Sequence, residues 1–185
     1  MKKRLFGIIA LALAWTAAPV HAEIVLFQAP DIIKAAAQDD VDTVRQLLMR
    51  GTNANTHDAS GKTSLIIAAT SGNLGLIDVL LDHGANLDAT DKVGNTALMW
   101  AAEQGDAAVV ERLIEGGANV NKENRQGMTP LMAAARSGRL DAVRALLDAG
   151  ARPEILDFTG RSARMWAQDG RNPRVVDVLA AAETR

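Results

Sequence analysis

The chain has 185 residues, which is enough for one domain with a substantial core. It contains no cysteine, so disulfides and thiol chemistry are excluded as sources of stability or function. Its 20 lysine and arginine residues stand against 22 aspartate and glutamate residues, and it has three phenylalanines and no tyrosine. This composition argues against nucleic-acid binding, which requires a basic surface with stacking aromatic side chains.

Residues 1–22 have the pattern of a signal peptide. Basic residues at 2–4 precede an apolar stretch at 5–14, and residues 20–22 have the small-x-small pattern of a signal-peptidase site. We predict cleavage after Ala22, which removes three basic residues and leaves 17 basic against 22 acidic ones. This type of peptide indicates export to the periplasm of a Gram-negative cell, with full secretion as an alternative.

A retained membrane anchor is the other interpretation of this segment. Residues 5–22 carry no firmly charged side chain, and their length falls just short of the roughly 20 residues that a spanning helix needs. Pro19 and the alanines before the predicted cleavage site favour removal. We therefore expect no membrane association after cleavage.

Glycines that recur every 33 residues divide the remainder of the chain into repeats. Leucine, paired alanine and aliphatic positions recur with the same period between them. Large apolar, small apolar and glycine positions do not exchange places, so the period is structural. The three glycine series are Gly61, Gly94, Gly127 and Gly160; Gly72, Gly105 and Gly138; and Gly51, Gly84, Gly117 and Gly150.

Each repeat is predicted to form two short helices. Thr63, Thr96 and Thr129 occupy positions where a hydroxyl would cap the first helix. The second and third glycine series are placed to end the two helices in the left-handed conformation. Helices of about 8 residues do not persist alone in water, so the repeats must stack.

These units resemble the ankyrin repeat, and residues 94–126, "GNTALMWAAEQGDAAVVERLIEGGANVNKENRQ", match its glycine, Thr-Pro-Leu, Ala-Ala, Leu-Leu and Gly-Ala-Asn pattern closely. The resemblance implies an all-α solenoid of stacked helix-turn-helix units with short hairpin tips, about five units including caps. We expect an N-terminal cap at 23–60, full repeats at 61–93, 94–126 and 127–159, and a C-terminal cap at 160–185. The family's usual histidine after the leucine is replaced by Ile33, Ile66, Met99, Met132 and Met165.

The resemblance also implies a protein that binds a protein partner through its concave face and turn tips, without catalysis or a cofactor. We expect a monomer. Residues at these places vary from unit to unit while the framework repeats. Their basic members suggest an acidic partner surface, and a solvated face of mixed charge is the alternative. The predicted partner-binding residues are Lys62, Thr70, Lys92, Asn95, Trp100, Glu103, Gln104, Arg125, Met128, Arg136, Ser137 and Arg161.

Trp100 is the strongest single candidate among them. Its position in the other units is occupied by very different residues, namely Lys34, Ile67, Ala133 and Trp166. A position that varies so widely is not wholly in the core, and aromatic side chains dominate protein interfaces. We expect Trp100 to be partly packed and partly available to a partner. The alternative is that it only covers the small Ala133.

The sequence offers little support for an enzyme or a metal site. His57 and His83 lack the spacing of a helical metal pair. Asp58, Asp91 and Asp157 recur at the repeat period, with Asn124 at the equivalent place, which is typical of turn-forming side chains. A repeated methionine position allows an alternative function as an oxidant sink, although core packing explains it more simply. For an exported ankyrin protein we expect an accessory role in envelope stress or peroxide defence, or immunity to a toxin.

Overall fold

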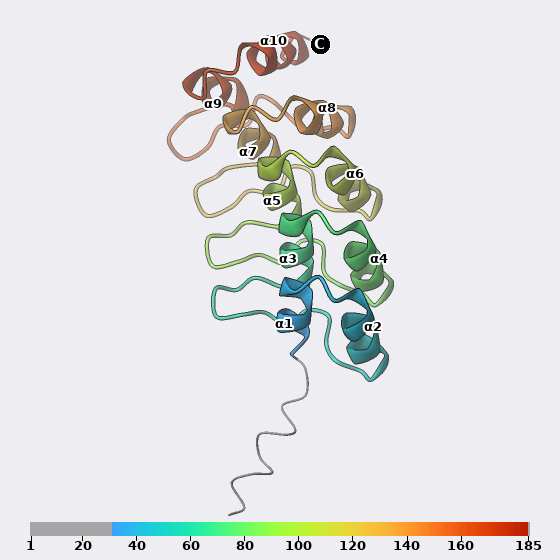
Figure 1. The fold of residues 1–185 in the computed structure, drawn as a ribbon. Coiled ribbons are helices and arrows are strands. Elements are labelled where there is room, and N and C mark those ends of the chain that lie inside the picture. The colour runs from blue at the N-terminus through green and yellow to red at the C-terminus, as the bar shows by residue number, and fades with distance from the viewer. Residues whose placement is uncertain (1–30, 185) are drawn as a thin grey trace, which may run out of the picture.

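The computed structural model describes residues 31–184. The predicted signal peptide and its alternative as an anchor lie outside the described residues. Within residues 31–184 there are ten helices, and they confirm the expected all-α stack of helix-turn-helix units (Figure 1). The helices form five consecutive pairs: α1 (Ile32–Ala37) and α2 (Val41–Met49); α3 (Ser64–Ser71) and α4 (Leu74–Asp82); α5 (Ala97–Gln104) and α6 (Ala107–Glu115); α7 (Pro130–Arg136) and α8 (Leu140–Asp148); α9 (Ala163–Asp169) and α10 (Pro173–Ala182).

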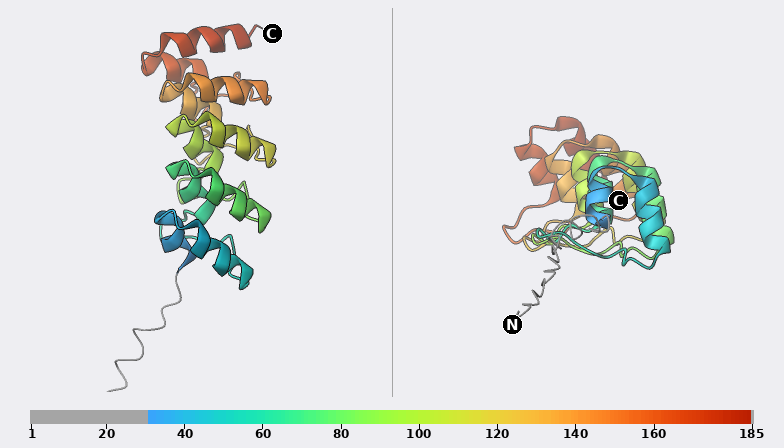
Figure 2. Two further views of the ribbon diagram at one scale, coloured as in Figure 1. Left: turned by 45° about the vertical axis from the view of Figure 1, so that its right-hand side comes forward. Right: turned by 60° about the horizontal axis from the view of Figure 1, so that its bottom comes forward.

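The pairs stack into two helical layers. The first helix of each pair packs on the first helix of the next, and α1, α3, α5, α7 and α9 are called the inner helices. The second helices, α2, α4, α6, α8 and α10, form the outer layer (Figure 2). Each loop from an outer helix to the next inner helix projects to the same side of the stack (Figure 1). The hairpins in these loops, residues 58–62, 91–95, 124–128 and 157–161, are called the tips.

Local capping explains where the inner helices begin and end. Thr63, Thr96 and Thr129 are the N-caps of α3, α5 and α7, as predicted, and each hydroxyl accepts a hydrogen bond from the amide three residues later. The helices α3 and α5 end at left-handed glycines. Helix α7 ends at Arg136, and the left-handed glycine follows two residues later, at Gly138.

The core runs continuously along the stack between the two layers. Paired alanines in α3, α5 and α7 are fully buried, which lets neighbouring inner helices approach closely. Met99 and Met132 are 3% and 1% exposed, whereas Met165 in the last unit is 45% exposed. The two central methionines therefore fill the core.

The last unit has the polar outer side that a terminal repeat needs. Arg164 stands where the three full repeats have a core leucine, and its Nε lies 3.0 Å from Glu183 Oε2. Its side chain is 40% exposed at the end of the stack, so the charge is only partly buried. Among residues 31–184, no helix combines the length and apolar character that crossing a bilayer requires.

Candidate functional site

A carboxylate or amide side chain closes each tip. In the tip at 91–95, Asp91 Oδ1 accepts hydrogen bonds from the amides of Val93 and Asn95, both at 2.9 Å. This arrangement confirms the prediction that the repeated acidic positions form turns. The equivalent side chains in the other tips, which bond their own backbone in the same way, are Asp58, Asn124 and Asp157.

Backbone hydrogen bonds join each tip to the next. The donor amides and acceptor carbonyls are Lys92 N to Ser60 O at 3.0 Å, Arg125 N to Val93 O at 3.2 Å, and Phe158 N to Gln126 O at 3.0 Å. The four tips therefore form one continuous ledge rather than four independent loops.

The tip-to-tip contact also explains why glycine recurs in the tips. Gly94 has φ of +92°, and a Cβ placed on it would lie 2.8 Å from the backbone nitrogen of Arg125. No tip follows Gly160, and a Cβ there would meet nothing within 4 Å. Glycine is thus required in the inner tips both by the backbone conformation and by the neighbouring chain.

Trp100 is fixed in place by the tip that precedes its helix and by the tip of the previous unit. Its indole Nε1 donates a hydrogen bond to Asp91 Oδ2 at 3.0 Å. The Lys62 ammonium lies 4.0 Å from the ring centroid, which is a cation–π contact. Trp100 is half-buried and also packs against the core. Both a framework role and a contact role are therefore consistent with its position.

The last unit repeats this arrangement. Trp166 Nε1 donates to Asp157 Oδ2 at 2.9 Å. The guanidinium carbons of Arg161 and Arg136 lie 4.8 and 5.8 Å from the centroid of the Trp166 ring. Two anchored tryptophans therefore lie on the inner helices α5 and α9, with one cation over the ring of Trp100 and two over that of Trp166.

An aspartate precedes each of the two tryptophans by nine residues. Three units lack the tryptophan and have Lys34, Ile67 and Ala133 at that position. Asp58 precedes Ile67 at the same spacing, so the aspartate alone does not specify a tryptophan. Asn124 precedes Ala133, where no indole requires a carboxylate oxygen as acceptor. The sequence analysis missed this pairing, although the Asp-Trp spacing is visible twice in the chain.

Hydrogen bonds within the tips lower the pKa of two tip carboxylates, Asp157 and Asp58. Burial is the largest influence on Asp157 and raises its pKa, but hydrogen bonds from Thr159, the Arg161 amide and Trp166 together hold that pKa below its usual value. For Asp58, the hydrogen bond from the Ser60 hydroxyl is the largest influence and lowers the pKa. The tips therefore contain internal negative charges as well as exposed cations.

The predicted partner-binding residues differ in exposure. Lys92, Gln104, Arg125, Arg136 and Arg161 are exposed. The half-buried ones are Lys62, Thr70, Asn95, Trp100, Glu103 and Ser137. Most of the set therefore lies on one surface, formed by the tips and the C-terminal ends of the inner helices.

Met128 is the exception, because it is only 8% exposed. The contact role expected for it does not agree with this burial. Equivalent positions hold Lys62, Asn95 and Arg161, whose polar groups contact Trp100, Asn124 and Asp169 at the surface. The apolar methionine instead turns inward, and its sulfur lies 3.9 Å from Nη1 of Arg136.

Ion pairs neutralise part of the positive charge expected on this surface. Arg136 Nη2 lies 2.7 Å from Glu103 Oε1, and Arg161 Nη1 lies 2.9 Å from Asp169 Oδ2. Lys92 and Arg125 make no ion pair with other residues of the described chain, 31–184. The free cations are therefore on the outer edge of the tips.

Two exposed apolar residues of the last tip region were not anticipated. Phe158 is 75% exposed and Leu156 is 53% exposed. Other units have Ala, Lys or Arg at the position of Phe158 and His, Thr or Glu at that of Leu156. Comparing residues 33 positions apart in the tips would have revealed this replacement of mostly polar side chains by large apolar ones in the last unit.

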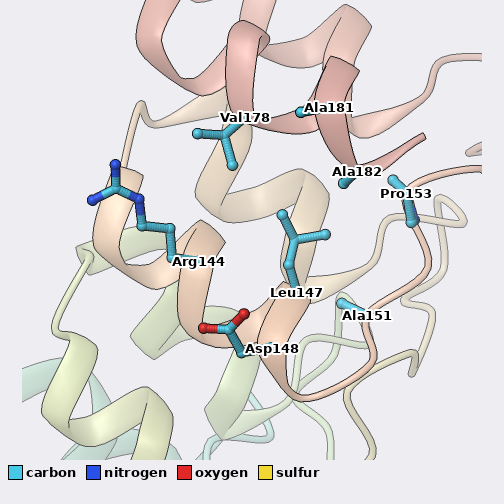
Figure 3. A pocket seen from close by; sticks show the side chains of 8 residues that line it. All are labelled: Arg144, Leu147, Asp148, Ala151, Pro153, Val178, Ala181 and Ala182. Carbon is cyan, nitrogen blue, oxygen red and sulfur yellow. The ribbon is translucent and has the colours of Figure 1, made fainter. Parts of the chain in front are cut away.

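A separate cleft of about 500 Å³ lies on the other side of the molecule, between α8 and α10 (Figure 3). Leu147, Val178 and Pro153 line it, with Arg144 and Asp148 also present. These residues offer no nucleophile with an adjacent base. Within residues 31–184, no three His, Cys, Asp or Glu side chains gather in a geometry that could hold a metal ion.

Stacked helix-turn-helix units joined by a ledge of hairpin tips define a repeat solenoid with an extended binding surface. The family model for ankyrin repeats (3 copies) matches residues 32–124 and 104–185, so the chain belongs to the ankyrin-repeat family. Comparison with curated proteins gives no match. Ankyrin repeats are typically non-enzymatic scaffolds, and they indicate a protein–protein interaction module.

Proposed function

We propose that this protein is a non-catalytic binding module of the bacterial periplasm, which holds a protein partner against its tips and the ends of its inner helices. The observation that supports it most directly is the anchored Trp100, a large aromatic side chain held by Asp91 and Lys62 on a repeating framework. Trp is enriched among the residues that dominate binding energy at protein interfaces.

Preorganisation supports the same conclusion. A side chain that is already fixed by a hydrogen bond and a cation–π contact loses less conformational entropy when a partner binds. Trp166 is held in the same manner at the far end of the surface. The residues between and around the two tryptophans vary from unit to unit, as a surface adapted to one partner requires.

The location and the biological role are proposals of their own. Periplasmic location depends on the signal-peptide pattern of residues 1–22. A monomer without a cofactor, acting in envelope stress, in peroxide defence or as an immunity protein, is compatible with this module. The oxidant-sink alternative is weakened because Met99 and Met132 are 3% and 1% exposed, which shields their sulfurs from oxidants.

Affinity capture from a periplasmic extract tests the proposal. The bait is the native protein, and it is compared with a Trp100→Ala/Arg136→Glu double variant. A control double variant, Arg45→Glu/Met49→Ser, alters exposed residues of the outer helix α2. Circular dichroism checks that all three baits are folded.

We expect mass spectrometry to find a protein that the native and control baits retain and the Trp100→Ala/Arg136→Glu bait loses. Equal retention by all three baits would contradict the placement of the binding surface. An empty capture, repeated after oxidant stress, would contradict the binding function itself.

A further inference from the structure

We propose that the row formed by Lys92, Arg125 and Phe158 binds an extended, acidic segment of the protein partner, with an apolar side chain of that segment against Phe158. This inference depends on the proposed binding function. It adds that the bound segment is acidic and that its apolar part lies at the C-terminal end of the stack. The row is called the tip row below.

The backbone of the tip row is held in place because its three residues each make an equivalent hydrogen bond. Each donates its amide hydrogen bond to a carbonyl of the preceding tip. The three side chains therefore start from equivalent points on successive units, and all three are exposed. Such a row presents regularly placed contacts to a chain that runs along the stack.

Charge indicates an acidic segment. Lys92 and Arg125 make no ion pair within residues 31–184, whereas the tip carboxylates Asp91 and Asp157 are turned inward and are only 6% and 5% exposed. A groove of about 400 Å³ lies beside the row, and Lys92, Arg125 and His57 line it together with two carboxylates. These carboxylates, Asp58 and Asp91, each accept two backbone hydrogen bonds from their own tip, whereas Lys92 and Arg125 have no such partner of opposite charge in the described part of the chain. Carboxylates of a bound segment would meet cations there that the protein itself leaves unpaired.

The apolar end of the row determines the order of the acidic and apolar parts of the segment along the stack. Phe158 packs over Gly127 yet remains 75% exposed, and Leu156 adds a second exposed apolar side chain at 53%. Exposed aromatic side chains at a rigid position are effective anchors for a partner. The acidic part of the segment therefore lies over the second and third tips and its apolar side chain over the fourth.

A protein segment fits this surface better than an anionic membrane. Glu123, two residues before Arg125, is exposed. A flat anionic lipid surface would face this carboxylate as well as the cations, and like charges repel one another within the Debye length of about 8–10 Å. A discrete segment contacts the cations and avoids the carboxylate.

Selection from random peptides displayed on phage tests the inference with a defined probe. Peptides of about 12 residues span roughly 40 Å when extended, enough to reach several tips. The purified full-length protein is the target. We expect enriched peptides to be acidic, with an aromatic or aliphatic residue toward one end.

The enriched peptides are then synthesised and their dissociation constants measured against variants. Phe158→Ser and Arg125→Glu should each weaken binding by about tenfold, and Glu123→Gln should strengthen it severalfold. The matched controls Met49→Ser and Arg45→Glu change an exposed apolar residue and an exposed cation of the outer helix α2 and should change nothing.

Several outcomes would overturn the inference. These are enrichment of basic or neutral peptides, failure to enrich any peptide, and binding that is insensitive to Phe158→Ser and Arg125→Glu. Binding to vesicles of anionic phospholipid that is lost in the same two variants would assign the row to a membrane instead. Partner capture that fails with the Trp100→Ala/Arg136→Glu bait but not with Phe158→Ser would reject the tip row and leave the proposed function intact.

Discussion

Replacing a tip glycine by alanine distinguishes two reasons for glycine at these positions, the positive φ angle and the close approach of the next tip. Gly94 and Gly160 have similar positive φ angles, +92° and +80°. A Cβ on Gly94 would lie 2.8 Å from Arg125 N and 3.2 Å from the Cα of Asn124, whereas a Cβ on Gly160 has open space. Gly160→Ala is therefore the matched control for Gly94→Ala.

The expected magnitudes follow from this geometry. An alanine in the left-handed region costs about 1–2 kcal/mol, and both variants incur that strain. In Gly94→Ala the backbone of the next tip must also move, which breaks the hydrogen bond from Arg125 N to Val93 O, worth about 1 kcal/mol. We expect losses of about 1–2 kcal/mol for Gly160→Ala and about 3 kcal/mol for Gly94→Ala.

Urea unfolding followed by circular dichroism measures both losses in the free energy of unfolding. Equal slopes of this free energy against urea concentration confirm that the variants expose the same surface area on unfolding. In thermal unfolding, each kcal/mol corresponds to roughly 2–4 °C for a protein of this size. Equal losses for the two variants would refute the argument that contact between neighbouring tips, rather than backbone conformation alone, fixes the glycine period.

Three further predictions concern the core, the anchored indole and the tip carboxylates. Ala101→Asp should unfold the stack by burying an unpaired charge at a fully buried position, whereas Ala108→Asp on the exposed side of α6 should remain folded by circular dichroism. In a double-mutant cycle by urea unfolding, Trp100→Phe and Asp91→Asn should show a coupling of about 1 kcal/mol, because each removes the same hydrogen bond; additive effects would argue against it. Asp157 has a lowered pKa in the folded state, so its carboxylate contributes stability above its unfolded pKa of about 3.9, and this contribution disappears as the pH falls toward the folded pKa. The stability difference between wild type and Asp157→Asn should therefore shrink below about pH 4 in urea titrations, and a constant difference would contradict the shift.

The fold could be predicted from the sequence because its signals are local and repeated. Thr96 caps α5, and Gly105 ends the same helix, as their places in the period indicate. The alanine pairs indicated where neighbouring helices approach. One exception is α7, in which the last turn ends before Gly138 although the pattern predicts the same end as in the other units.

The candidate site was less predictable because its contacts join different units. That Asp91 would form a turn follows from its own loop, but the use of its second oxygen by Trp100 depends on how the tip lies against the next helix. Lys62 covers Trp100 from the preceding tip, which no local pattern contains. Met128 shares a repeat position with polar residues that are half-buried or exposed, and its burial reflects the chemistry of its own side chain.

The dissociation constant of the captured protein partner tests the central claim most directly. It is measured for the native protein, for Trp100→Ala and for Met49→Ser, with the stability of each determined in parallel. The account predicts binding about tenfold weaker or more for Trp100→Ala and unchanged for Met49→Ser. Unchanged binding by a folded Trp100→Ala protein would contradict a partner-binding surface at the anchored tryptophan.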